Sequence, residues 1–273
     1  MEILDFLADP KVRRIMVSTA YLFHTSAFFT IIYHGFKYKT YGMPPFSTAA
    51  ALGFAVIVGF IGPFSDQSHL FPHEGDANFK VLVNLWRFWS VICLIILLQY
   101  LAWAKNHPSI WSDLQKFHLP KFINGYVLFI LLMLILGLGD WWFIVFYQDY
   151  YVNEISPLVM LFVAIGYLAT LFFRPKLLGL SLYVAWAWLI GNILLYAGTS
   201  LGPMDDPYPN AKHGYNFIYW LYALTVFLNF AYVYLLTKRR HELHHSFHAL
   251  TPANAPLAQA AEDLSEEIEK SSK

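Results

Sequence analysis

Charged residues are few in this 273-residue sequence: Asp, Glu, Lys and Arg together make up only 13% of it. The hydrophobic share is 58% and the mean hydropathy is +0.46, which is too apolar for the surface of a soluble globular protein. Basic and acidic residues number 18 each, and a net charge of zero argues against a nucleic-acid partner, which would need a basic face. We therefore expect an integral membrane protein in contact with membrane lipid and with no nucleic acid.

Cysteine is nearly absent as well. The single cysteine, Cys93, excludes an internal disulfide framework. The first ten residues carry three acids and no basic residue, so the sequence predicts no cleavable signal peptide. The first apolar run is instead expected to stay in the bilayer.

Long apolar runs are what the sequence has in abundance. Each run approaches the roughly 20 residues that cross a hydrocarbon core of about 30 Å. Helices are the expected form, because a lone strand could not satisfy its backbone hydrogen bonds in lipid. The fold class predicted is an all-α integral membrane protein with seven transmembrane helices, placed at residues 15–34, 44–64, 81–104, 123–146, 156–173, 178–198 and 215–236.

The distribution of basic residues predicts the orientation of these helices. Ten basic residues fall in the turns after the first, third and fifth helices and at the start of the tail, whereas acids outnumber bases on the opposite side. The N-terminus is therefore predicted outside or lumenal and the C-terminus cytosolic. The basic residues Lys11, Arg13 and Arg14 favour the opposite orientation. The ten are Lys37, Lys39, Lys105, Lys116, Lys121, Arg174, Lys176, Lys238, Arg239 and Arg240.

A short basic turn occurs twice. Phe36, Lys37, Lys39 and Gly42 align with residues 173, 174, 176 and 179, and both copies lie between apolar runs. Such a duplication predicts two parallel three-helix units joined by one linking helix. The segments are residues 1–14, an N-terminal segment; 15–104, the first unit; 123–146, the linking helix; 156–236, the second unit; and 237–273, a polar cytosolic tail. This plan resembles the PQ-loop and SWEET families, although the Pro-Gln pair is absent.

Three polar residues inside the predicted helices are candidates for function. Counting about 1.5 Å per residue from the helix ends places Asp140, Asn192 and Arg87 in one layer of the outer half. We expect Asp140 to donate a proton, and Arg87 and Asn192 to hold the polar end of an apolar substrate. Aromatic faces near this layer would stabilise a cation, and the substrate-binding indoles predicted are Trp86, Trp89 and Trp188, with Trp141 and Trp142 nearby.

A structural interpretation competes with this one. Asp140 and Arg87 would then neutralise each other as an ion pair, and the indoles would belong to the interfacial aromatic belt. His24, in the middle of the first helix, is predicted to be a hydrogen-bonded packing residue rather than a catalyst.

Histidine patterns raise the question of a metal. His69 and His73 resemble one box of the membrane di-iron enzymes, and the sequence from His241 to His245 resembles another. The predicted topology puts the two boxes on opposite sides of the membrane, so they cannot share a metal pair. His241, Glu242 and His245 also match the zinc-protease spacing, but in a tail with no catalytic domain around it. We predict no metal and no cofactor.

The first basic turn also carries a family resemblance. Phe36-Lys37-x-x-Thr40-Tyr41-Gly42-Met43 is similar to the turn after helix one in the seven-helix terpene cyclases of fungal meroterpenoid and indole-diterpene pathways. The likeness continues through Pro63, Gly179-Leu180-Ser181 and Tyr234 over most of the chain. It implies acid-initiated, metal-independent cyclisation of a prenylated, lipid-soluble substrate, epoxidised or not. It also implies a multi-pass membrane location, in the endoplasmic reticulum if the chain is eukaryotic.

The sequence departs from that family at both of its acids. The family's helix-two Trp-Glu pair falls on Phe54 and Ala55, and its helix-seven Asp falls on Ala231, with Asn229 nearby. Asp140, which falls where the family has a helix-four His, is therefore the proton donor expected here, since a carboxylic acid desolvated in a membrane retains its proton.

Two other functions fit the sequence. A SWEET-like or PQ-loop-like carrier would use the same repeat and line its path with Asp140, Arg87 and Asn192. A non-catalytic membrane scaffold would explain the missing acids. The oligomeric state is left open.

Overall fold

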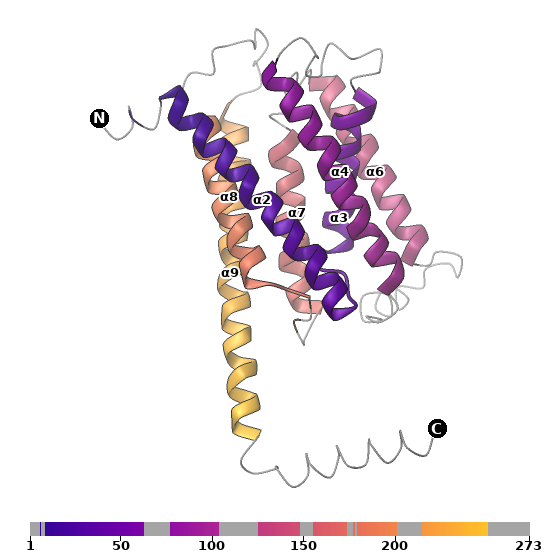
Figure 1. The fold of residues 1–273 in the computed structure, drawn as a ribbon, viewed down its shortest axis with the longest axis vertical. Coiled ribbons are helices and arrows are strands. Elements are labelled where there is room, and N and C mark those ends of the chain that lie inside the picture. The colour runs from indigo at the N-terminus through magenta and orange to yellow at the C-terminus, as the bar shows by residue number, and fades with distance from the viewer. Residues whose placement is uncertain are drawn as a thin grey trace. The chain divides into compact units, whose positions relative to one another are not determined.

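The computed structural model describes residues 6, 9–62, 77–103, 125–147, 155–173, 177, 179–200 and 215–250. Every element of secondary structure among these residues is a helix. The predicted all-α fold is thus confirmed for this part of the chain (Figure 1). The helices are α2 (Pro10–Tyr38), α3 (Pro45–Val56), the π-helical turn η1 (Ile57–Ile61), α4 (Ala77–Trp103), α6 (Gly125–Tyr147), α7 (Ile155–Phe173), α8 (Leu182–Ser200) and α9 (Tyr215–Leu250).

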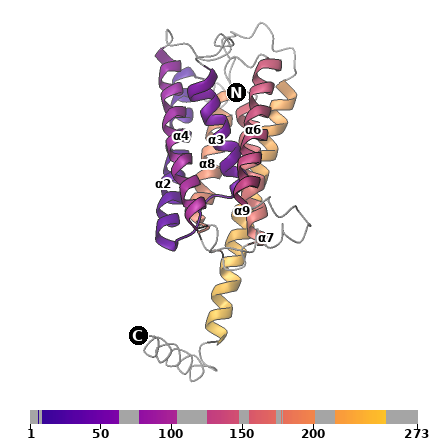
Figure 2. The same cartoon turned by 90° about the vertical axis from the view of Figure 1, so that its right-hand side faces the viewer.

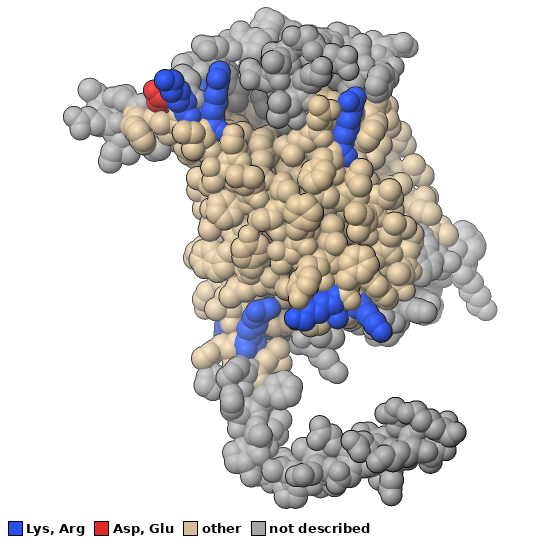
Figure 3. All heavy atoms as spheres, in the orientation of Figure 1, with Lys and Arg blue, Asp and Glu red and all other residues tan. Residues whose placement is uncertain are grey.

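The helices have the length and composition of membrane spans. Among the described residues, four helical segments are long and apolar enough to cross a membrane: Lys11–Tyr38, Val83–Trp103, Leu182–Thr199 and Ile218–Leu243. The shorter apolar helices Pro45–Ile61, Ile130–Phe146 and Ser156–Phe172 fall within the other predicted spans. On the face shown in Figure 3, described basic side chains lie above and below an uncharged band. These features agree with a membrane protein, whereas seven spans and their orientation stay predictions.

The chain forms two compact units, Met1–Val233 and Tyr234–Lys273. In the first unit, α2 packs along α8, while α3 packs against α4, α6 and α7 (Figures 1 and 2). In the second unit, α9 continues to Leu250, and Lys238 lies 4.0 Å from Glu242 one helical turn on. The predicted tail from residue 237 is therefore helical as far as Leu250.

Local signals set the ends of α2. The Asp9 carboxylate caps the N-terminus by accepting hydrogen bonds from the backbone N–H groups of Lys11 (2.7 Å) and Val12 (3.3 Å), and Pro10 takes the first helical position. At the other end, Lys39 adopts a left-handed conformation with φ 46°, which stops the helix.

The basic turn is exposed at Phe36, Lys37 and Lys39, and the chain is buried from Thr40 to Pro44. Tyr41 and Met43 are inside the first unit, and the Tyr41 ring packs edge-on against Tyr100 with centroids 5.2 Å apart. Tyr167 donates a hydrogen bond to the carbonyl of Gly42 at 3.5 Å. The most specific family resemblance in the sequence therefore lies in a turn that anchors α3 between its neighbours.

The second copy of the turn differs in backbone conformation. Its left-handed residues are Leu177 (φ 53°) and Gly179 (φ 78°), whereas Lys39 has this conformation in the first copy. The Leu180 N–H closes the turn on the Leu177 carbonyl at 3.1 Å. The duplication stays a prediction from the sequence.

Glycines let two pairs of helices approach closely. A Cβ added at Gly53 would lie 3.2 Å from the Cα of Gly137, where α3 crosses α6. At Gly59 it would lie 3.1 Å from the backbone nitrogen of Arg87, where η1 meets α4. Small residues that bring backbones together are typical of helix contacts in membranes.

Candidate functional site

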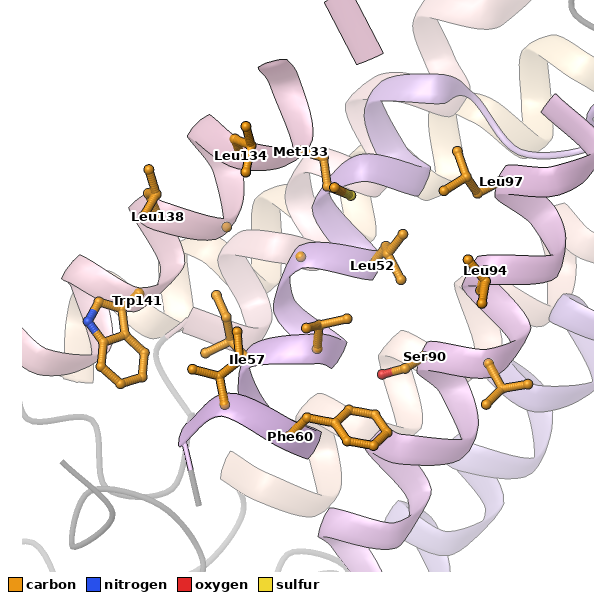
Figure 4. Close-up of a pocket in the computed structure, with 15 residues that line it drawn as sticks. Leu52, Ile57, Phe60, Ser90, Leu94, Leu97, Met133, Leu134, Leu138 and Trp141 are labelled. Atoms are coloured by element: carbon orange, nitrogen blue, oxygen red, sulfur yellow. The ribbon is translucent and has the colours of Figure 1, made fainter. Parts of the chain in front are cut away.

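A groove lies between α4 and α6, with α3 and η1 as its floor. Its volume is about 700 Å³, within the range of small-molecule sites. Figure 4 shows Leu134, Leu138 and Trp141 of α6 on one side and Ser90, Leu94 and Leu97 of α4 on the other, with Leu52 and Ile57 between them. Helices α3 and α6 come close together at Gly53 and Gly137, and both glycines line the groove.

The walls of the groove are almost wholly apolar. Ser90 carries the one hydroxyl among the groove-lining residues, and that hydroxyl donates to the Trp86 carbonyl of its own helix at 2.9 Å. Several wall residues, such as Leu94 and Leu138, are 47% and 67% exposed, so the groove is open along its length. Such a surface suits an apolar chain that enters from lipid.

Arg87 lies at the end of the groove formed by η1. Its Nε–H donates to the Gly59 carbonyl at 2.8 Å, and its guanidinium carbon lies 5.8 Å from the centre of the Phe60 ring, which lines the groove. An Nη1–H also donates to Asn84 at 3.3 Å. A π-helical turn such as η1 is often found at functional sites.

Asp140 is buried on α6, beside the groove rather than in it. It follows Gly137 by one helical turn and directly precedes Trp141, and both of these line the groove. Its Oδ2 atom is buried and has no hydrogen-bond partner. The contacts described for Arg87 are with Gly59 and Asn84, and the alternative of a structural pair between Asp140 and Arg87 stays a prediction.

The three predicted indoles do come together, inside the first unit. Trp86, Trp89 and Trp188 are 5%, 2% and 3% exposed, and the rings of Trp86 and Trp89 meet edge-on with centroids 4.8 Å apart. With Phe28, Phe54 and Ala55 they surround a void of only about 10 Å³, which is room for roughly one water molecule. They do not belong to an interfacial belt, and they do not line the groove.

His24 is held between the indoles and α8. Its ring lies 4.9 Å from that of Trp188, and a Cβ added at Gly191 would come within 2.6 Å of its Cδ2 and Nε2 atoms. Asn192 is the polar side chain beside it, yet neither ring nitrogen has a hydrogen bond of good geometry. His24 packs with the Asn192 side chain as its polar neighbour, and the hydrogen bond between them stays a prediction.

The predicted polar layer is thus divided among three interfaces. Arg87 faces η1, Asn192 faces α2 through His24, and Asp140 lies on α6, whose main neighbour is α3. Counting residues along a helix gives depth but not the direction in which a side chain points. The groove itself was missed, because its leucines and isoleucines look like any residues that face lipid; the pair of glycines at 53 and 137 was the available signal.

Metal ligands do not gather in the described part of the chain, where no group of three or more His, Cys, Asp or Glu residues is placed to hold an ion. His69 and His73 lie outside the described residues. His241 and Glu242 are exposed on α9 in the second unit. The di-iron and zinc interpretations gain no support from this geometry.

Comparison of the chain with protein-family models, with curated proteins and with solved structures finds no match. The resemblance to the terpene cyclases and the likeness to PQ-loop and SWEET repeats therefore stay predictions. Function has to be argued from the groove and from the residues around it.

Proposed function

We propose that this protein is a membrane-embedded enzyme of the terpene cyclase type, acting on a prenylated, lipid-soluble substrate. The observation that carries the proposal is the apolar groove of about 700 Å³ between α4 and α6. Prenyl chains partition into lipid, and an open apolar groove in a membrane-spanning bundle can take them up without passing through water. The hydrophobic side chains of the wall would bind the chain along its length.

The proposed reaction begins with a proton. Asp140 would protonate an epoxide oxygen or an olefin of the bound substrate, and an internal double bond would attack the resulting cation and close a ring. Loss of a proton from carbon ends the reaction, so substrate and product are isomers and no cofactor is consumed. Asp140 is not itself a lining residue, but it lies one helical turn from Gly137 and next to Trp141, both of which line the groove.

The finer topology belongs to the same proposal. We assign seven transmembrane helices, an outer or lumenal N-terminus and a cytosolic C-terminus, in a multi-pass protein of the endoplasmic reticulum if the chain is eukaryotic. The proposed Asp140 donor then lies in the outer half of the membrane. The basic residues Lys37, Lys39 and Lys238 support this orientation.

Conversion of substrate tests the proposal. The chain is expressed in a host supplied with farnesylated aromatic compounds and their terminal epoxides, and extracts are searched for products isomeric with the substrate. We expect a cyclised isomer that needs the protein and that falls strongly with Leu94→Trp, which fills the groove. Leu22→Trp, which changes another exposed leucine on α2 away from the groove, is the control. Equal yields from both variants would place the chemistry elsewhere.

The donor is tested separately. A positioned general acid contributes about a hundredfold or more to a rate. Asp140→Asn keeps the shape of the side chain and removes its acidic proton, so we expect the rate of cyclisation to fall by about that factor with membrane insertion unchanged, and Asp140→Glu to retain part of it. An undiminished rate in Asp140→Asn would remove Asp140 from the mechanism.

A second candidate function is binding without chemistry. Ala55 lines the aromatic void at the position where the cyclases carry their helix-two acid, and Phe54 replaces the neighbouring Trp. A scaffold that holds a prenylated molecule in the groove would need neither acid. Binding of a farnesylated compound with no isomer formed, in protein that is folded, favours this second function.

A further inference from the structure

The groove between α4 and α6 has two different ends (Figure 4). Phe60, Ser90 and Trp141 line one end, and Leu97 and Met133 line the other. Phe60 is 44% exposed, so the groove is open where η1 forms its floor. The end at Leu97 and Met133 is closed by other side chains of the first unit.

A cluster of buried side chains lies behind Leu97 and Met133. It consists of Tyr41, Ala49 and Tyr100, which are 0%, 0% and 1% exposed, and both groove residues pack against it. Tyr41 comes from the turn after α2, and its ring meets that of Tyr100 edge-on. We call these five residues the closed end of the groove.

All three helices around the groove contribute to its closed end. On α4, Tyr100 follows Leu97 by three residues, and on α3, Ala49 precedes the groove-lining Leu52 by three. On α6, Leu132 packs against the same cluster. The next turn of each helix therefore places a packed side chain where the groove would otherwise continue.

The closed end limits the length of the groove. Helix α4 rises by about 10 Å from Ser90 to Leu97, and α6 rises by about 12 Å from Met133 to Trp141. With carbon–carbon bonds of about 1.5 Å, an extended chain of three isoprene units is slightly longer than this range. A fourth unit would have to bend back at the closed end or displace the polar end of the molecule.

Charge at the open end gives the bound molecule a direction. The Arg87 guanidinium carbon lies 5.8 Å from the centre of the Phe60 ring, whereas the closed end is built from apolar and aromatic side chains. An amphiphilic molecule would keep its polar end near η1 and extend its hydrocarbon tail toward Leu97 and Met133.

We propose that the closed end selects the length of the prenyl chain, with Leu97 and Met133 as specificity-determining residues that limit it to about three isoprene units. This inference rests on the proposed binding of a prenyl chain in the groove, but not on proton transfer from Asp140. A chain that moves from lipid into the groove exchanges one apolar environment for another, so the fit of the chain decides between lengths.

Competition between isoprenoid alcohols of different lengths tests the proposal. The protein in lipid nanodiscs is photolabelled with a farnesol analogue bearing a diazirine, and geraniol, farnesol or geranylgeraniol is added as competitor. Competitor concentrations are expressed per lipid, so that unequal partitioning into the bilayer cancels. We expect geranylgeraniol to need a concentration about fivefold or more above that of farnesol, because extra carbons are forced against packed side chains.

Two variants change the closed end in opposite directions. Met133→Ala removes a side chain from it, so farnesol should lose its advantage over geranylgeraniol. Leu97→Phe adds bulk there and should shift the preference toward geraniol. Leu134→Ala is the matched control, because Leu134 is the neighbour of Met133 on α6 and lines the groove, but is 51% exposed at its open side. The control should keep the ranking of the unaltered protein.

The outcomes separate this inference from the proposed function. Equal displacement by farnesol and geranylgeraniol in the unaltered protein, or a ranking that neither closed-end variant changes, would overturn length selection while a prenyl chain still binds. Failure of every alcohol to displace the label would overturn the inference and the proposed function together. The expected ranking in a protein that forms no cyclised isomer would support length selection and remove only the reaction.

Discussion

At the scale of single residues, the His24 ring packs directly against Gly191. The imidazole occupies the space in which any side chain at position 191 would begin, and it is packed against Trp188 from the other side. The pair joins α2 to α8, the most closely associated helices of the first unit. His24, which the sequence predicted to be a packing residue, therefore fills the space between two helices, with Asn192 beside its ring.

We predict that Gly191→Ala destabilises the protein by about 1–3 kcal/mol, because the new methyl group overlaps the His24 ring. His24→Ala removes that overlap, so the double variant should lose less stability than the two single losses added together. Thermal unfolding in detergent measures all three variants. Gly139→Ala is the control, because a Cβ there meets nothing within 4 Å. Additive losses would mean that the two residues do not touch.

The aromatic cluster at this scale could be predicted from the sequence, whereas the groove could not. Trp86, Trp89 and Trp188 were expected to gather around an aromatic space, and they do. The structure does not place Asp140 and Arg87 in this aromatic cluster as expected, because counting along a helix predicted only how deep each residue lies in the membrane. The direction of a side chain depends on which neighbour its helix packs against, and that follows from contacts such as Gly53 with Gly137.

At the scale of single elements, η1 shapes one end of the groove. The π-helical turn brings Gly59 against the backbone of α4 and turns the Gly59 carbonyl toward the Nε–H of Arg87. Phe60, next in the turn, then lies between the guanidinium and the groove. The sequence predicted one helix over residues 44–64 and gave no sign of this change in helix type.

We predict that Gly59→Ala shifts η1 away from α4, because the added methyl group would meet backbone atoms of Trp86 and Arg87 that cannot rotate aside. The expected cost is about 1–3 kcal/mol of stability, together with weaker binding of prenylated ligands through displacement of Phe60. Thermal unfolding and ligand titration measure the two effects. Ala55→Gly, a change of similar size in the preceding helix α3 and at a residue that does not line the groove, should leave ligand affinity unaltered.

The positions of the described helices were predictable from composition, whereas the groove was not. Every described helix overlaps one of the seven apolar runs, since hydrophobic length alone marks a segment for the bilayer. A groove is different, because Leu94 and Leu138 face it with the same chemistry that faces lipid elsewhere. Only the close crossing of two helices distinguishes such a hollow from the surrounding surface.

At the scale of the whole molecule, the orientation of the chain in the membrane decides on which side the proposed reaction takes place. We predict an outer or lumenal N-terminus and a cytosolic C-terminus. Glycosylation acceptor sites added at either end of the full chain measure this in a eukaryotic host. An acceptor at the N-terminus should be glycosylated and one after Lys273 should not. The reverse pattern would invert the orientation derived from the basic turns.

The central claim is that a prenyl chain occupies the groove between α4 and α6. The most direct measurement is photolabelling of the protein in lipid nanodiscs with a farnesol analogue bearing a diazirine, followed by mass spectrometry of the labelled peptides. The account predicts that label concentrates on groove residues such as Leu94, Leu134 and Leu138, and that excess farnesol displaces it. Label spread equally over lipid-facing residues of α2 such as Leu22, and insensitive to farnesol, would contradict the account.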